Sequence, residues 1–124
     1  RLSNLNSNLQ EGLAGAARVF ELIDTPAAIV DPSNPQFLDR AQGQVEFDQV
    51  CFGYSFEKKA IDHLSLVIRP GQTVAFVGPS GAGKSTIINL IPRFYDVNKG
   101  RILIDGQDIR FLTLYDLRRQ IALV

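Results

Sequence analysis

This 124-residue sequence has no methionine or tryptophan, one histidine and one cysteine. The lone Cys51 excludes an internal disulfide and offers no metal-ligand cluster, so we expect a buried thiol in a reducing compartment. Thirteen basic residues balance thirteen acidic ones, so no net field attracts nucleic acid and no nucleic-acid partner is expected. No run approaches the ~20 apolar residues of a membrane span. A chain that begins at Arg1 without any methionine is expected to be a piece of a longer protein.

The most informative motif is GPSGAGKST, at residues 78–86, which fits the phosphate-binding pattern GxxxxGKS/T at every fixed position. From average residue frequencies, a chance match anywhere in the chain is below about 1 %. The apolar run TVAFV at residues 73–77 predicts a β-strand before the glycines, and STIINLI at residues 85–91 predicts a helix after them. Strand, tight loop and helix are the order that a nucleoside triphosphate site requires.

The chemistry of this motif comes mainly from its backbone. Three glycines without Cβ allow the loop to wrap around phosphate oxygens with its N–H groups pointing inward, and the following helix adds its positive end. Lys84, the predicted catalytic residue, would reach the β and γ phosphates, Ser85 would ligate Mg²⁺, and Thr86 would donate to the α phosphate. The alternative is a glycine-rich turn with a solvated lysine. The predicted nucleotide-binding residues are Gly78, Pro79, Ser80, Gly81, Ala82, Gly83, Lys84, Ser85 and Thr86.

The segments before the motif predict a helix, a linker and two strands. Residues 25–42 contain three prolines and the cluster DPSN, which is typical of an extended linker. Residues 45–54 alternate as a half-buried strand does, and residues 64–68 predict a second strand. His63 is expected to be an exposed turn residue. Apolar side chains at spacings of three and four predict one packing face on an N-terminal helix: Leu2, Leu5, Leu9, Leu13, Ala16, Phe20 and Ile23.

After the motif, Pro92 should end or kink the helix near Leu90. Residues 101–105 predict a strand that ends in an Asp-Gly reverse turn. Thr113, with an acidic residue three positions later, predicts a capped short helix through Arg119. Residues 121–124, IALV, predict the beginning of a buried strand.

Residues 45–124 also resemble one family. With FGY before the loop, then RFYD, GRILIDGQDI and LRRQIALV after it, they are similar to the first part of the nucleotide-binding domain of an ATP-binding cassette (ABC) transporter. The N-terminal helix and GLAGAARVFELID resemble the cytoplasmic continuation of the last membrane helix in exporters. The resemblance implies an α/β fold, a partial P-loop NTPase core with antiparallel strands before the P-loop strand and an N-terminal amphipathic helix. It divides the chain into a helical extension (1–24), a linker (25–42) and a truncated nucleotide-binding domain (43–124).

The resemblance also assigns roles and partners. Tyr54 takes the position at which the family stacks an aromatic ring on adenine, although a strand residue packed in the core would give the same pattern. The catalytic glutamate, switch histidine, glutamine loop and signature of the family have no match here, so this piece should bind ATP weakly and not hydrolyse it. Its implied partners are a transmembrane domain and a second nucleotide-binding domain, at the cytoplasmic face of a membrane such as the bacterial inner membrane. A small P-loop kinase or GTPase and a non-catalytic assembly fragment are the alternatives.

Overall fold

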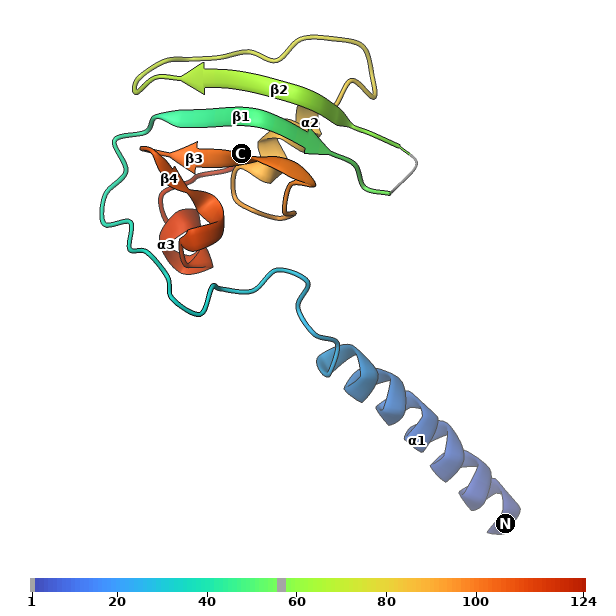
Figure 1. The fold of residues 1–124 in the computed structure, drawn as a ribbon. Helices are drawn as coiled ribbons and strands as arrows, with labels where there is room; N and C mark the ends of the chain where they lie inside the picture. The colour runs from blue at the N-terminus through green and yellow to red at the C-terminus, as the bar shows by residue number, and fades with distance from the viewer. Residues whose placement is uncertain (1, 56–57) are drawn as a thin grey trace.

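The computed structural model describes residues 2–55 and 58–124, with the side chains of residues 2–8 outside the description. Helix α1 (Leu2–Ile23) extends away from the rest of the chain (Figure 1). Its apolar residues Leu9, Leu13 and Phe20 are each about three-fifths exposed, at 62 %, 61 % and 62 %. The N-terminal helix is therefore confirmed, and its described apolar side chains face solvent, while Leu2 and Leu5 lie outside the described side chains. No helix in the described residues combines the length and apolar character needed to cross a bilayer.

A four-stranded antiparallel sheet forms the centre of the fold. It contains β1 (Val45–Phe52), β2 (Ile61–Ile68), β3 (Lys99–Ile104) and β4 (Gln107–Asp108), in the order β2-β1-β3-β4. Val45 lies opposite Ile68 on one side and Ile104 on the other. The two predicted strands before the P-loop thus form an antiparallel hairpin. The mixed α/β fold class with antiparallel strands is confirmed. The expectation that His63 is a turn residue is wrong, because β2 begins at Ile61, two residues before it.

The core lies between this sheet and short helices. Helix α2 (Lys84–Leu90) crosses one face, while the 3₁₀ turn η1 (Ile109–Phe111) and helix α3 (Leu114–Arg118) follow β4 (Figure 1). Thr113 Oγ1 accepts the Asp116 N–H at 3.0 Å, which confirms the predicted cap of α3. The side chains that are less than 2 % exposed are the centre of this core: Phe47, Val50, Leu90, Ile102, Leu112 and Leu117.

The predicted linker lies along this core as an extended segment. The Asp31 carboxylate accepts the N–H of Leu114 at 2.7 Å, and Gln36 forms a parallel bridge with Leu112. Leu38 is 4 % exposed and belongs to the core cluster. Prolines prevent a helix here, so side chains and single bridges hold the segment in place.

Two predicted strands are wrong. Residues 73–77 and 121–124 have no regular secondary structure and form no ladder with any described strand. Burial still alternates in the first of them, since Val74 and Phe76 are half-buried while Val77 is 89 % exposed. A strand exists only where neighbours accept and donate its backbone hydrogen bonds. Residues 73–77 therefore keep the alternating burial of a strand without its pairing, whereas residues 121–124 have neither.

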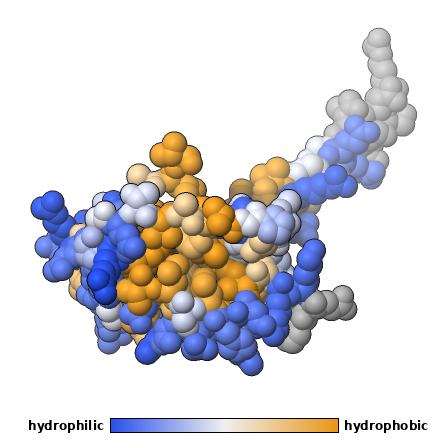
Figure 2. Space-filling model, turned by 90° about the horizontal axis from the view of Figure 1, so that it is seen from above, coloured by the Kyte–Doolittle hydropathy of each residue, from blue (hydrophilic) through white to orange (hydrophobic). Residues whose placement is uncertain are grey.

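The face on which residues 73–77 lie is strongly apolar. Figure 2 shows a broad hydrophobic patch on the side seen from above, where β2 and the segment after it lie in Figure 1. Val67 is 49 % exposed and Val77 89 % exposed. A patch of this kind is typical of a surface that another polypeptide segment covers.

Candidate functional site

The glycine-rich loop between residues 78 and 83 has the backbone conformation that the motif predicts. Gly78, Gly81 and Gly83 have φ values of 153°, 82° and 82°, in the region that favours glycine. Gly83 also caps helix α2 without any side-chain hydrogen bond. Because the first N–H groups of a helix have no partner within it, a cap without a side chain leaves them for a ligand.

Gly83 is required for close packing as well as for its φ value. A Cβ placed there would lie 2.5 Å from the carbonyl oxygen of Ala60, at the start of β2. The turn into α2 therefore sits directly against the sheet. This contact fixes where the helix begins and hence where the loop N–H groups lie.

Lys84 reaches back across the loop. Its Nζ donates to the carbonyl oxygens of Gly78 at 2.8 Å and Pro79 at 2.7 Å, and the Ala82 N–H donates to the same Pro79 oxygen at 3.3 Å. The loop is thus curled around an ammonium group. A positive charge therefore lies against the carbonyl groups at the beginning of the loop.

Ser85 and Thr86, the two hydroxyl residues in the first turn of α2, lie in different surroundings. Ser85 is exposed, as a residue that ligates a metal ion from solvent must be. Thr86 is 6 % exposed, and its Oγ1 lies 3.2 Å from the hydroxyl of Tyr54, with either atom able to donate. The structure therefore brings Tyr54, which precedes Thr86 by 32 residues in sequence, to the beginning of α2.

Tyr54 is held by an aromatic cluster that sequence reasoning did not assign. Its ring meets the Phe52 ring edge-on at 5.0 Å and the Tyr95 ring edge-on at 5.1 Å. Asn98 adds to this support, because its Oδ1 accepts the Gly53 N–H at 2.7 Å. Perpendicular ring pairs are favourable and fix orientation, and 58 % of Tyr54 stays exposed. Tyr95 belongs to the RFYD motif, which is part of the family resemblance. That motif is the sequence feature that could have identified Tyr95 as a neighbour of Tyr54.

Two pockets adjoin Tyr54. One of about 380 Å³ is lined by the aromatic cluster together with Ala28 and Ile29 of the linker. The other, of about 550 Å³, includes Lys59, which donates to Asp62 Oδ1 at 3.1 Å. This hydrogen bond from Lys59 lowers the pKa of the Asp62 carboxyl below its usual value.

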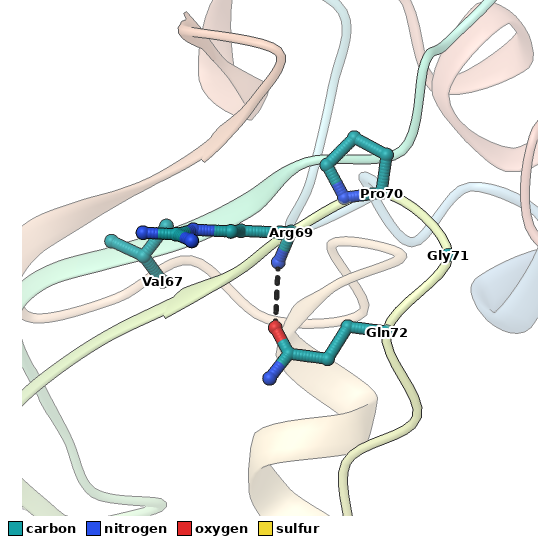
Figure 3. A pocket seen from close by; sticks show the side chains of 5 residues that line it. All are labelled: Val67, Arg69, Pro70, Gly71 and Gln72. Atoms are coloured by element: carbon teal, nitrogen blue, oxygen red, sulfur yellow. Dashed lines mark hydrogen bonds between the residues drawn. The ribbon is translucent and has the colours of Figure 1, made fainter.

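A third pocket lies at the turn after β2, and none of the predicted nucleotide-binding residues line it. In Figure 3, the Arg69 N–H donates to Gln72 Oε1 at 3.0 Å, while the Arg69 side chain points away beside Val67. The Gln72 N–H donates back to the Arg69 carbonyl at 3.1 Å. These two hydrogen bonds close the turn. Among the residues that line this pocket, no polar groups converge in a way that would select a ligand.

A glycine-rich loop that leads into a short helix, in a chain with an antiparallel hairpin before it, is typical of the P-loop class of proteins. Residues 61–124 match the family model for ABC transporters, and the chain belongs to that family. The resemblance to an ABC exporter predicted from the sequence is confirmed.

Relatives extend the likeness to the whole chain. The ATP-dependent lipid A-core flippase of Syntrophus aciditrophicus is 49 % identical over 124 residues, which is all of this chain and 20 % of the relative. The protein of the same name from Cupriavidus metallidurans is 50 % identical over 125 residues, with 99 % and 20 % covered. A bacterial Atm1-family ABC exporter solved with ATP bound has a TM-score of 0.76 and 46 % identity, covering 91 % of this chain and 20 % of its own. This chain therefore spans about a fifth of the proteins it matches.

Proposed function

We propose that this chain is the ATP-binding segment of an ABC exporter, which couples ATP binding and hydrolysis to transport of a substrate across a membrane. The observation that carries the proposal is the curled loop, with the Lys84 ammonium on the Gly78 and Pro79 carbonyls beside a glycine-capped helix. A solvated lysine on an ordinary turn would not be held by two carbonyl oxygens. The family membership and a solved relative with ATP bound give independent support.

Each motif residue then has a separate task. Lys84 Nζ would exchange the loop carbonyls for oxygens of the β and γ phosphates, where its charge stabilises the transferring phosphoryl group. The exposed Ser85 hydroxyl would ligate Mg²⁺, which supplies further positive charge when bound. Thr86 would turn its hydroxyl from Tyr54 to the α phosphate. The remaining residues of the loop, Gly78, Pro79, Ser80, Gly81, Ala82 and Gly83, would contribute backbone N–H groups.

Tyr54 would form the base-binding surface. Its exposed ring stands beside the start of α2, so a nucleotide with phosphates in the loop would extend its base towards this ring. Stacking on an aromatic face is worth roughly 1–3 kcal/mol per base in single-stranded nucleic-acid complexes. The edge-on contacts with Phe52 and Tyr95 keep the ring from rotating away.

The parent protein would supply the remaining parts. We propose residues 1–24 as an extension from a transmembrane domain, 25–42 as a linker and 43–124 as the first part of the nucleotide-binding domain, at the cytoplasmic face of a bacterial inner membrane. A glutamate outside this chain would orient the attacking water, and a second nucleotide-binding domain would complete the ATP sandwich. The names of the relatives make a lipid A-core glycolipid the first transport substrate to test.

Calorimetry with Mg-ATP tests the nucleotide site. We expect weak binding by the chain, no binding by Lys84→Ala, and unchanged binding by Arg40→Ala, which removes an exposed cation from the linker. Phosphate release by the chain should not exceed that of Lys84→Ala. Equal ATP affinity in Lys84→Ala and the starting chain would refute the proposal.

A further inference from the structure

Three side chains of metal-binding type meet on the two strands before the P-loop. Cys51 of β1 and Asp62 and His63 of β2 place a sulfur, a carboxylate oxygen and a ring nitrogen within 4.8 Å of one another. Cys51 is buried, while the Asp62 and His63 side chains are 56 % and 61 % exposed. The sequence-based expectation that Cys51 offers no metal-ligand cluster is therefore wrong, because strand pairing supplies its neighbours.

A β-bulge creates this grouping. Val50 lies opposite Leu64 and Phe52 lies opposite Ile61, so Asp62 and His63 together face the single residue Cys51. His63 has a left-handed φ of 51°, which is uncommon for a residue other than glycine. In a regular ladder, consecutive side chains point to opposite faces of the sheet. The extra residue of the bulge re-aims one of them, so both β2 side chains approach the same sulfur.

The distances suit a small tetrahedral ion. Zinc with sulfur at ~2.3 Å and nitrogen or oxygen at ~2.0 Å requires about 3.5 Å between sulfur and oxygen, and about 3.3 Å between nitrogen and oxygen. Cys51 Sγ lies 3.7 Å from Asp62 Oδ1, and His63 Nδ1 lies 2.9 Å from the same oxygen. Shifts of a few tenths of an ångström would bring these two distances to the tetrahedral values, and the sulfur and ring nitrogen lie within 4.8 Å of each other, against about 3.5 Å in such a site. The backbone N–H of His63 also donates to Cys51 Sγ at 3.3 Å, which holds the sulfur beside β2.

We propose that Cys51, Asp62 and His63 bind a divalent metal ion of the zinc class, with water at the fourth position. Mixed thiolate, imidazole and carboxylate ligands select Zn²⁺ or Co²⁺ over Mg²⁺ or Ca²⁺. The cavity of about 550 Å³ that Cys51 and His63 line provides room for the water and a route for the ion. This site is separate from the Mg²⁺ that Ser85 would hold, and it does not depend on nucleotide binding.

Lys59 is the competitor for this site. Its Nζ lies 3.1 Å from Asp62 Oδ1, the oxygen that the metal would use, and its side chain is 67 % exposed. Metal binding therefore displaces a surface ion pair, which contributes little to stability. Lys59→Gln removes the competing charge and should raise the affinity for the metal.

The test is titration of the 124-residue chain with Co²⁺, followed by Zn²⁺ displacement in a calorimeter. Since Cys51 is the single cysteine of the sequence, a thiolate-to-cobalt charge-transfer band reports this residue alone. We expect the band to saturate at one equivalent and to disappear on addition of Zn²⁺. His63→Asn retains a residue that tolerates left-handed φ and should lower the affinity roughly tenfold or more, as should Asp62→Asn.

Asp24→Asn is the matched control, because it removes an exposed carboxylate at the end of α1. It should bind Co²⁺ as the starting chain does, and Lys59→Gln should bind it more tightly. Absence of the thiolate band at one equivalent would overturn the proposal. So would His63→Asn and Asp62→Asn variants whose affinities equal that of Asp24→Asn.

Discussion

Gly83→Ala and Gly81→Ala form a matched pair that separates two reasons for glycine in the P-loop. Both residues have a φ of 82°, so the left-handed backbone should destabilise an alanine variant by the same amount, about 1–2 kcal/mol, at either position. At Gly81 a new Cβ would have no atom within 4 Å. At Gly83 it would lie 2.5 Å from the Ala60 carbonyl oxygen and 3.6 Å from the Ile61 side chain.

The contact at Gly83 adds a second cost. A backbone oxygen cannot rotate away as a flexible side chain does, so either β2 or the start of α2 must shift. Overpacking of this kind costs about 1–3 kcal/mol. We therefore expect Gly81→Ala to lower the free energy of unfolding by about 1–2 kcal/mol and Gly83→Ala by roughly 2–5 kcal/mol, the sum of the two terms.

Urea denaturation followed by circular dichroism measures both variants under the same conditions. The informative quantity is the difference between them, because the shared φ penalty cancels. Variants that agree within about 0.5 kcal/mol would show that the Ala60 contact does not constrain the loop. A Gly83→Ala chain that remains folded should also lose ATP affinity, since the beginning of α2 would have moved.

Three further predictions concern the base, the linker and the core. Tyr54→Ala should weaken ATP binding by about 1–3 kcal/mol in calorimetry, while Tyr54→Phe, which keeps the ring and loses the Thr86 contact, should bind almost normally; equal losses in both would rule out stacking. Asp105→Ala should destabilise the chain to urea by about 1–3 kcal/mol, because this carboxylate accepts the Gln42 and Gln44 N–H groups at 2.6 and 2.9 Å; Asp105→Asn retains an acceptor and should lose less. Leu112→Ala should cost about 2–5 kcal/mol, because Leu112 is completely buried, whereas the 74 % exposed Tyr115 should tolerate alanine at under about 1 kcal/mol; similar thermal shifts in the two would contradict the described core.

The local elements of the fold could be predicted because their signals are short in sequence. Pro92 ends α2 near the expected residue, and Thr113 caps α3 through its own hydroxyl. Asp105 and Gly106 both have positive φ, at 50° and 80°, in the reverse turn that their residue types predict. Each of these features depends on atoms within a few residues of one another. The two wrong strands, at residues 73–77 and 121–124, arose because an apolar pattern indicates burial but does not show whether a neighbouring strand is present.

The sequence by itself determined the shape and charge of the glycine-rich loop, since glycines and a lysine at fixed spacing specify both. Only the tertiary structure decided which distant groups join it. The Tyr54 hydroxyl reaches Thr86, and Tyr95 orients the Tyr54 ring, through packing that no local spacing encodes. The grouping of Cys51 with Asp62 and His63 likewise depends on a bulge in strand pairing. Strand register is set by the burial of a whole sheet face, and for that reason it cannot be read from any one segment.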